Sequence, residues 1–167
     1  IAVNASPETL VSEDLRDLIA RYPCDRVVVE LTEHARVDDY DAVSEAVAWY
    51  RARGVRLAVD DAGAGFASFQ HILRLQPDII KLDMELVRQI DTNPVRRAIV
   101  QGILGVCQAL SIEVIAEGVE TDAEYHTLRA MGVHYFQGYL FAKPAFEQLP
   151  VVTWPAGCEL SETGAGI

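Results

Sequence analysis

Six short, mostly apolar segments alternate with segments of helical periodicity along the chain. These apolar segments are 1–4, 26–33, 56–61, 78–83, 113–117 and 134–140. Each has the length of a β-strand, and the apolar residues between them recur at the spacing of an amphipathic helix. Regular alternation of strand and helix predicts βα units and a parallel sheet buried on both faces. This pattern constrains the fold class more than any other feature.

The number of units selects the architecture. A flavodoxin-like sheet has about five strands, and no Gly-x-Gly-x-x-Gly motif follows the first strand as a dinucleotide-binding fold requires. We therefore predict an α/β fold of the (β/α)8 TIM type, with six βα units visible. We expect the first part of the barrel, two further units, to precede Ile1 or to come from a partner. Residues 1–149 are the predicted barrel domain and residues 150–167 a C-terminal tail.

Helix signals support the same arrangement. Predicted helices cover 7–22, 40–53, 68–75, 93–110 and 121–131. Asp39 is a predicted N-cap, and Thr121 with Glu124 forms a predicted capping box. In the long fourth helix Val95, Ile99, Ile103, Val106 and Leu110 are predicted to share one apolar face.

The cysteines and the net charge restrict the class of protein. Cys24, Cys107 and Cys158 form no Cys-x-x-Cys motif, so we expect neither a zinc site nor a disulfide framework, and Cys107 is predicted to be buried in a helix. A net charge of −11 without a basic stripe argues against binding of DNA or RNA polymers and of anionic membranes. No apolar run spans a membrane and no secretory signal is visible, so we expect a cytoplasmic domain.

A polar side chain ends every predicted strand. In chain order these residues are Asn4, Glu30, Asp60 with Asp61, Lys81, Glu117 and Gln137. The carboxyl ends of the strands of a (β/α)8 barrel converge on the face that carries the active site. A single acid at a strand end can equally be a helix cap or a solvated residue. The adjacent aspartates, for example, can be an N-cap and a solvated turn residue. Recurrence on all six strands favours a shared site.

The residue types indicate a metal site. Carboxylate and amide oxygens without a Cys or His cluster suit Mg²⁺ or Mn²⁺, and four carboxylates can hold two ions for phosphoester hydrolysis. Lys81 can hydrogen-bond the attacking water or neutralise a phosphate, and it can also form a structural salt bridge with Asp60 or Glu117. The histidines share no ligand spacing and are predicted to be solvated or at the core edge: His34, His71, His126 and His134.

Seven motifs together carry a resemblance to a known family. They are Val3-Asn-Ala-Ser-Pro7, Glu30-Leu-Thr-Glu33, Asp60-Asp-Ala-Gly-Ala-Gly65, Ile80-Lys-Leu-Asp83, Ala116-Glu-Gly-Val-Glu120, Gln137-Gly-Tyr139 and Lys143-Pro144. In this order they resemble the EAL domain family of bacterial cyclic di-GMP phosphodiesterases. The resemblance implies a modified (β/α)8 barrel that dimerises and opens cyclic di-GMP to linear pGpG with Mg²⁺ or Mn²⁺, using two ions.

The resemblance also implies a role for each matching residue. Metal ligands would be Asn4, Glu30, Asp60, Asp61 and Glu117. Lys81 would hold the nucleophilic water, Glu117 or Lys81 would assist as base, and Gln137 would hold a water or phosphate. Supporting residues would be Glu33, Asp83, Glu120, Gly63 and Gly65.

Two departures from the family pattern qualify this interpretation. The Glu-Ala-Leu signature, whose glutamate binds metal, does not occur in the chain, and Ala62 and Ala64 replace the Phe and Thr usual in the loop. A catalytically inactive cyclic di-GMP receptor or regulatory domain is therefore the alternative function. An enolase-like barrel that abstracts a proton with a strand-end lysine is a third hypothesis.

Overall fold

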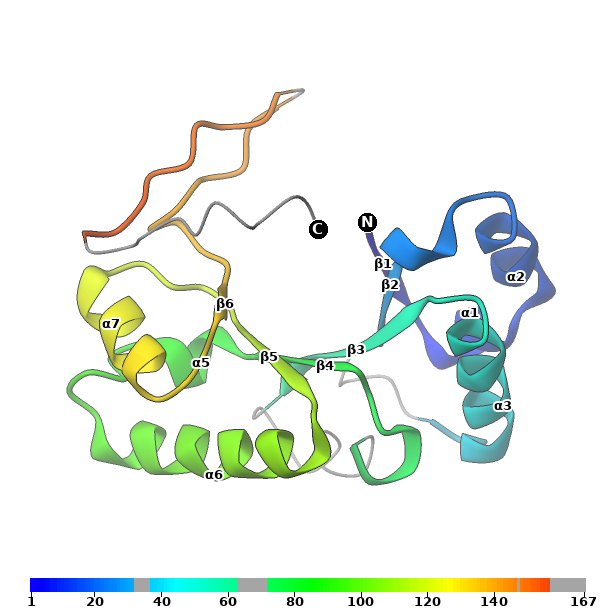
Figure 1. Ribbon diagram of the computed structural model, residues 1–167, viewed down its shortest axis with the longest axis horizontal. Coiled ribbons are helices and arrows are strands. Elements are labelled where there is room, and N and C mark those ends of the chain that lie inside the picture. The colour runs from blue at the N-terminus through cyan, green and yellow to red at the C-terminus, as the bar shows by residue number, and fades with distance from the viewer. Residues whose placement is uncertain (32–36, 63–71, 147, 157–167) are drawn as a thin grey trace. The chain divides into compact units, whose positions relative to one another are not determined.

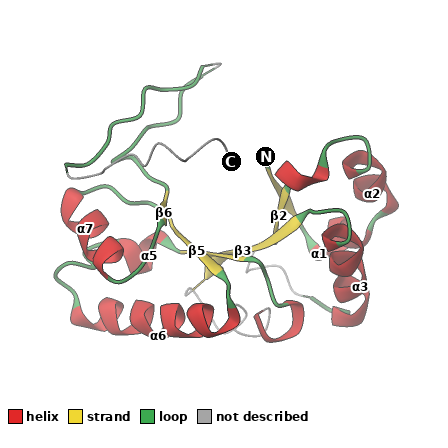
Figure 2. Ribbon diagram, in the orientation of Figure 1, coloured by secondary structure: helices red, strands yellow, loops and turns green. Residues whose placement is uncertain are grey.

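Six parallel βα units are present in the computed structural model, which describes residues 1–31, 37–62, 72–146 and 148–156. The strands form one sheet in sequence order: β1 (Ala2–Ala5), β2 (Val28–Leu31), β3 (Arg56–Ala62), β4 (Ile79–Leu82), β5 (Glu113–Ala116) and β6 (Tyr135–Phe136). The helices are α1 (Pro7–Val11), α2 (Glu13–Ile19), α3 (Tyr40–Arg51), α5 (Met84–Val87), α6 (Pro94–Leu110) and α7 (Asp122–Ala130) (Figures 1 and 2). The predicted alternation of strand and helix is confirmed.

The chain forms two compact units. The first unit comprises Ile1–Lys81 and Cys107–Glu113, and the second comprises Leu82–Val106 and Val114–Ile167. Within the described residues no helix is both long enough and apolar enough to cross a membrane.

The core of the first unit lies between β1–β3 and helices α1–α3. Val29 and Leu31 of β2 and Leu57 of β3 point into this core, where they pack with Val47 and Tyr50 of α3. The Tyr50 hydroxyl donates a hydrogen bond of 2.9 Å to the carbonyl of Leu10, so burial of this phenol leaves no unpaired donor. Because side chains alternate along a strand, the residues between these apolar ones face the opposite side of the sheet.

The predicted helix 7–22 is wrong in one respect, since it consists of two helices that meet at Ser12. The backbone of Ser12 is extended, with φ −73° and ψ 143°. Its hydroxyl donates to the carbonyl of Thr9 at 2.7 Å and accepts from the amide of Leu15 at 3.3 Å. A side chain that caps both helices competes with continuous helix formation.

The apolar face predicted for α6 is present but mostly exposed. Of the five residues expected on one apolar face, only Ile103 is buried, and Val95, Ile99, Val106 and Leu110 are exposed. Val100 and Cys107 share the buried face with Ile103 instead. The periodic pattern indicated the helix correctly but placed its buried face about a quarter-turn away, because both faces of α6 carry apolar residues.

The ends of two further elements differ from the prediction. β6 contains two residues rather than seven, and Gly138 follows it at a point where an added Cβ would overlap the backbone of Val119. The predicted helix 68–75 lies outside the described residues except at 72–75, which are helical. Helix α5 was not predicted.

Cys107 gives a direct test of the packing of α6. Burial raises the pKa of its thiol to about 11, so the reactive thiolate is scarce at neutral pH. We expect Cys107 to resist iodoacetamide at about pH 8 in the folded chain and to react once urea unfolds it. Peptide mass spectrometry would measure the modification, and rapid alkylation in native buffer would contradict the buried position.

Candidate functional site

Polar side chains of the first unit share the sheet face opposite helices α1–α3. Asn4 of β1 and Glu30 of β2 are Cα partners in the parallel register, and Glu30 is in turn paired with Ala58 of β3. Asp60 lies two residues beyond Ala58, so its side chain is on the same face as that of Glu30. The register therefore brings together three of the predicted ligands near the carboxyl ends of adjacent strands.

Lys81 of β4 forms ion pairs with two of these acidic groups. Its ammonium donates to Glu30 Oε2 at 3.2 Å and lies 3.1 Å from Asp60 Oδ1. The side chains are nearly buried, with 8% of Lys81, 12% of Glu30 and 17% of Asp60 exposed. Carboxylates this far from water need a cation or hydrogen-bond donors. The structural ion pair considered for Lys81 and Asp60 is thus present.

The remaining predicted groups of the first unit are less fully described. Asn4 is exposed. Asp61 and Ala62 belong to β3, but their side chains lie outside the described part of the chain, as do Glu33, Gly63, Ala64 and Gly65. Of the histidines, His126 and His134 are exposed, as expected, and His34 and His71 lie outside the described residues.

In the second unit, Glu117 and Gln137 leave neighbouring strands at the same level. Glu117 follows Ala116 of β5, Gln137 follows Phe136 of β6, and Ala116 and Phe136 are Cα partners. The Gln137 amide donates to the carbonyl of Ala116 at 2.8 Å, and the Glu117 amide donates to that of Leu82 at 3.2 Å. Glu117 is half-buried and Gln137 is exposed. Both predicted residues therefore occupy strand ends, as expected.

Arg88, which the sequence did not single out, binds the predicted supporting residue Glu120. Both terminal nitrogens of its guanidinium donate to the two carboxylate oxygens of Glu120. This bidentate pair raises the pKa of Arg88 and lowers that of Glu120. Asp83, the other supporting residue of this unit, caps α5 by accepting a hydrogen bond from the Glu85 amide.

Glu124 is a second residue whose wider role the sequence did not reveal. The predicted capping box with Thr121 is confirmed. Its Oε2 accepts from the amides of Glu120 at 3.0 Å and Thr121 at 3.1 Å, and its Oε1 accepts from the Gln89 amide at 2.9 Å. Burial acts to raise the pKa of Glu124, but these donors outweigh burial and the pKa lies below its ordinary value.

The donor chemistry suits a hard divalent cation. Glu30 and Asp60 supply carboxylate oxygens at adjacent strand ends, which is the ligand type that Mg²⁺, Mn²⁺ and Ca²⁺ prefer. Within the described residues no group of three or more His, Cys, Asp and Glu side chains is arranged to hold a metal ion. The described carboxylates thus fit part of a ligand set.

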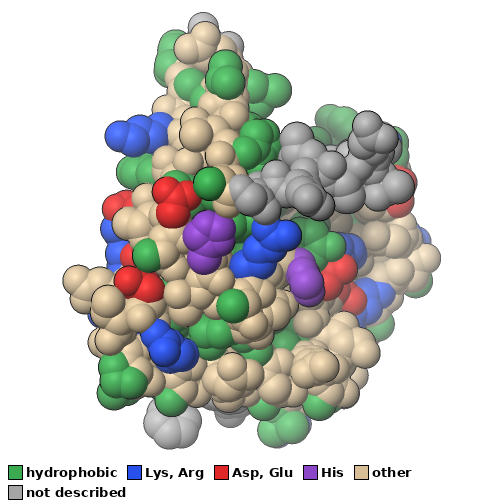
Figure 3. Space-filling view, turned by 60° about the vertical axis from the view of Figure 1, so that its left-hand side comes forward, with side chains coloured by type: hydrophobic (Ala, Val, Ile, Leu, Met, Phe, Trp, Pro, Cys, Tyr) green, Lys and Arg blue, Asp and Glu red, His purple; other side chains and the backbone are tan. Residues whose placement is uncertain are grey.

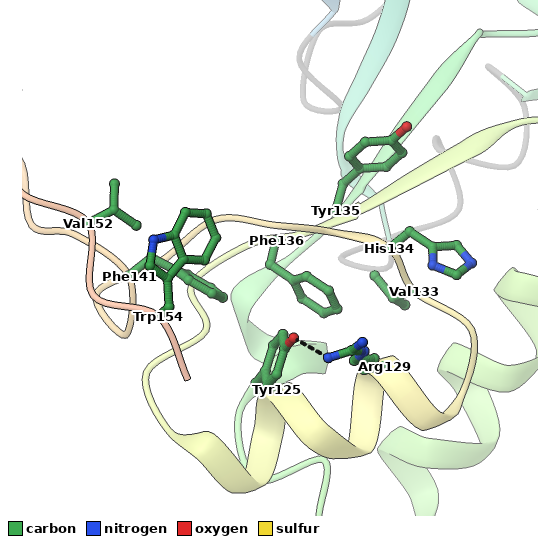
Figure 4. A pocket seen from close by; sticks show the side chains of 9 residues that line it. All are labelled: Tyr125, Arg129, Val133, His134, Tyr135, Phe136, Phe141, Val152 and Trp154. Carbon is green, nitrogen blue, oxygen red and sulfur yellow. Dashed lines mark hydrogen bonds between the residues drawn. The ribbon is translucent and has the colours of Figure 1, made fainter. Parts of the chain in front are cut away.

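An apolar pocket lies within the second unit. It has a volume of about 500 Å³ and is lined mainly by α7, β6 and the segment that follows. Aromatic rings dominate it, and Arg129 donates to the Tyr125 hydroxyl at its floor (Figure 4). Its lining includes Val133 and His134 before β6, Phe136 within it, and Phe141 and Trp154 after it.

On the face drawn in Figure 3, acidic, basic and histidine side chains are interspersed rather than separated by sign.

Comparisons with known proteins identify the family. The family model of the EAL domain matches residues 1–144. The chain is 36% identical over 162 residues to the blue light- and temperature-regulated antirepressor BluF of Escherichia coli K12, covering 93% of this chain and 40% of BluF. It is 36% identical over 161 residues to the cyclic di-GMP phosphodiesterase PdeR of the same organism, covering 89% of this chain and 24% of PdeR. The chain thus spans less than half the length of these curated relatives.

Solved structures of similar proteins show the same fold. A standalone EAL protein from Vibrio cholerae O395, bound to c-di-GMP, superposes with a TM-score of 0.82 at 36% identity, covering 91% of this chain and 67% of that one. BlrP1 of Klebsiella pneumoniae, in complex with manganese and cyclic di-GMP, gives a TM-score of 0.77 at 37% identity, covering 86% and 38%.

These likenesses and the parallel sheet define the class as an α/β protein of the TIM-barrel type, with charged residues at the carboxyl ends of its strands. More narrowly, the chain belongs to the EAL domain family.

Replacing Lys81 tests the electrostatic role of its ammonium. We expect Lys81→Met to lower the free energy of unfolding by about 3 kcal/mol, because it leaves Glu30 and Asp60 without this cation. Urea denaturation would measure the loss. The exposed Lys143 provides the matched control, and Lys143→Met should change stability by less than about 0.5 kcal/mol. Equal effects of the two substitutions would contradict this role.

The lowered pKa of Glu124 predicts a pH dependence of stability. A carboxyl whose pKa is lower in the folded chain stabilises fully above its unfolded pKa and loses that contribution as the pH falls through the folded value. We therefore expect the stability advantage of the wild type over Glu124→Gln to shrink as the pH falls from about 7 to about 3. Urea denaturation across this range would measure it, and a constant difference would contradict the hydrogen-bonded carboxylate.

Proposed function

We propose that this chain is the catalytic part of a phosphodiesterase that hydrolyses cyclic di-GMP to linear pGpG. The single observation that carries the proposal is the cluster of Lys81, Glu30 and Asp60 at strand ends. This cluster occurs in a chain of the same family as the phosphodiesterase PdeR and the BlrP1 complex with manganese and cyclic di-GMP. An ammonium beside two carboxylates suits a site that binds cations and an anionic phosphodiester.

The proposed metals are Mg²⁺ or Mn²⁺. The ligands would be Asn4, Glu30, Asp60, Asp61 and Glu117. When bound, such ions neutralise charge on the phosphate and lower the pKa of a coordinated water. Asn4 would supply an amide oxygen and the four acids carboxylate oxygens, the hard donors that these ions require.

The protein groups would position the water and manage its proton. Lys81 has an ammonium that Glu30 and Asp60 hold in place, so it would orient the water and offset negative charge that develops on the phosphate. Glu117 is half-buried and anchored by its backbone amide, and it would accept the proton of the water. Gln137 would hold a second water or a phosphate oxygen from the end of the neighbouring strand.

A second function is favoured by the likeness to BluF, whose name describes an antirepressor. In this case the chain would bind cyclic di-GMP or a partner protein without cleaving the dinucleotide. The replacement of the usual Phe and Thr by Ala62 and Ala64 also favours it. Binding without formation of pGpG would support this regulatory role.

Incubation with cyclic di-GMP and Mn²⁺ is the experiment that tests the proposal. We expect pGpG to form, as measured by chromatography, and to disappear in Asp60→Asn. Glu117→Gln should lower kcat by roughly 10² to 10⁴-fold because it removes a base and a metal ligand.

The matched control is Glu113→Gln at the other end of β5, where Glu113 pairs with Arg56. We expect this variant to keep the wild-type rate, and circular dichroism should show that both variants are folded. A fully active Glu117→Gln variant would contradict the site assignment. Absence of pGpG from the wild type would contradict catalysis by this chain.

A further inference from the structure

We propose that Arg88 and Glu124 are positioning residues that hold the backbone after Glu117 and so orient its carboxylate. This inference rests on the proposed function of Glu117. Neither residue belongs to the set of predicted ligands, and all of the contacts that carry the inference lie within the second unit.

Arg88 connects the end of α5 to the segment that follows β5. Its guanidinium binds Glu120 through both carboxylate oxygens, an arrangement that fixes direction as well as distance. The arginine itself is anchored, because its amide donates to the carbonyl of Met84 at 2.9 Å and its carbonyl accepts from the Arg96 guanidinium. Glu120, which lies three residues after Glu117, is thus held in a fixed position relative to Arg88.

Glu124 makes a second connection between the same two segments. One carboxylate oxygen receives the amides of Glu120 and Thr121, and the other receives the amide of Gln89 next to Arg88. The side chain is 4% exposed, so water offers these donors little competition. A buried carboxylate with three backbone donors holds its partners strongly.

Two close backbone approaches remove the remaining freedom of the segment. Gly118 has φ +66°, and a Cβ there would lie 2.6 Å from the Cβ of Met84. On the other side, the Val119 amide donates to the carbonyl of Gln137 at 3.1 Å, and Gly138 packs against the Val119 backbone. Residues 117–121 are therefore held against α5 and against the end of β6.

Together, these contacts of residues 117–121 determine the position and direction in which the side chain of Glu117 leaves the backbone. The residue lies between Ala116, paired in β5, and Gly118, packed on Met84. A ligand must be held to within about 0.5 Å of its productive position, and groups that orient ligands contribute about 10- to 100-fold to metal affinity. Loss of Arg88 or Glu124 should therefore weaken metal binding without removing a ligand.

The test compares Arg88→Met, Arg88→Lys and Glu124→Gln with Arg97→Met in the full chain. Arg97 is a matched control because its guanidinium donates to the carbonyls of Ile90 and Asp91 rather than to Glu120. Calorimetric titration with Mn²⁺ should show about tenfold weaker binding for Arg88→Met and Glu124→Gln. Arg88→Lys keeps the charge but offers a single donor nitrogen, so it should recover part of the affinity. Arg97→Met should bind like the wild type.

Two further readouts separate positioning from general stability. Amide hydrogen exchange of the metal-free Glu124→Gln variant should accelerate more at Glu120 and Thr121 than in α3. In hydrolysis, Arg88→Met and Glu124→Gln should lower kcat at saturating Mn²⁺ and leave the KM for cyclic di-GMP within about twofold.

The outcomes distinguish this inference from the proposed function. A wild type that binds Mn²⁺ and cleaves cyclic di-GMP, with variants that equal it in affinity and kcat, would contradict the positioning role alone. Exchange that accelerates as much in α3 as at Glu120 and Thr121 would also contradict it. A wild type that neither binds Mn²⁺ nor forms pGpG would contradict the proposed function.

Discussion

The polar face of the first unit depends on the ammonium of Lys81. Parallel pairing of β2 and β3 places Glu30 and Asp60 on one face, where two nearly buried carboxylates would repel each other. Lys81 on β4 forms ion pairs with both, and its ammonium compensates the negative charge on this face of the sheet. The cation site that we propose therefore depends on the same arrangement that compensates the charge of these acids.

Strand positions were predictable because the alternation of apolar and polar residues is a local property of the sequence. Glu30, Lys81 and Glu117 follow apolar runs, and their placement at strand ends needed only the count of residues. The helix break at Ser12 was not predicted, since Ser6 with Pro7 already supplied an N-cap signal and the apolar spacing continued through Ser12. On α6, apolar residues on both faces made the periodicity ambiguous, and only packing selects Val100 and Cys107.

The support of the predicted site was less predictable than its ligands. Arg88 binds a carboxylate 32 residues away, and Glu124 accepts from an amide 35 residues away. No local pattern contains such pairings, and an arginine after a short helix has many possible partners. The sequence identified Glu124 as a capping-box residue. It did not reveal that the other carboxylate oxygen, Oε1, accepts a hydrogen bond from the Gln89 amide after α5. Candidate ligand types are thus readable from strand ends, whereas the contacts that we propose to orient them come from tertiary structure.

Gly118 and Gly138 have a consequence for how related sequences are interpreted. Each follows a predicted site residue, Glu117 or Gln137, yet the requirement for glycine at these positions is steric. Gly118 approaches the side chain of Met84, and Gly138 approaches the backbone of Val119. A relative that had lost its catalytic acids would still need both glycines in order to fold. Retention of a glycine-containing motif around these positions therefore reports an intact scaffold, and only the neighbouring carboxylate and amide report on chemistry.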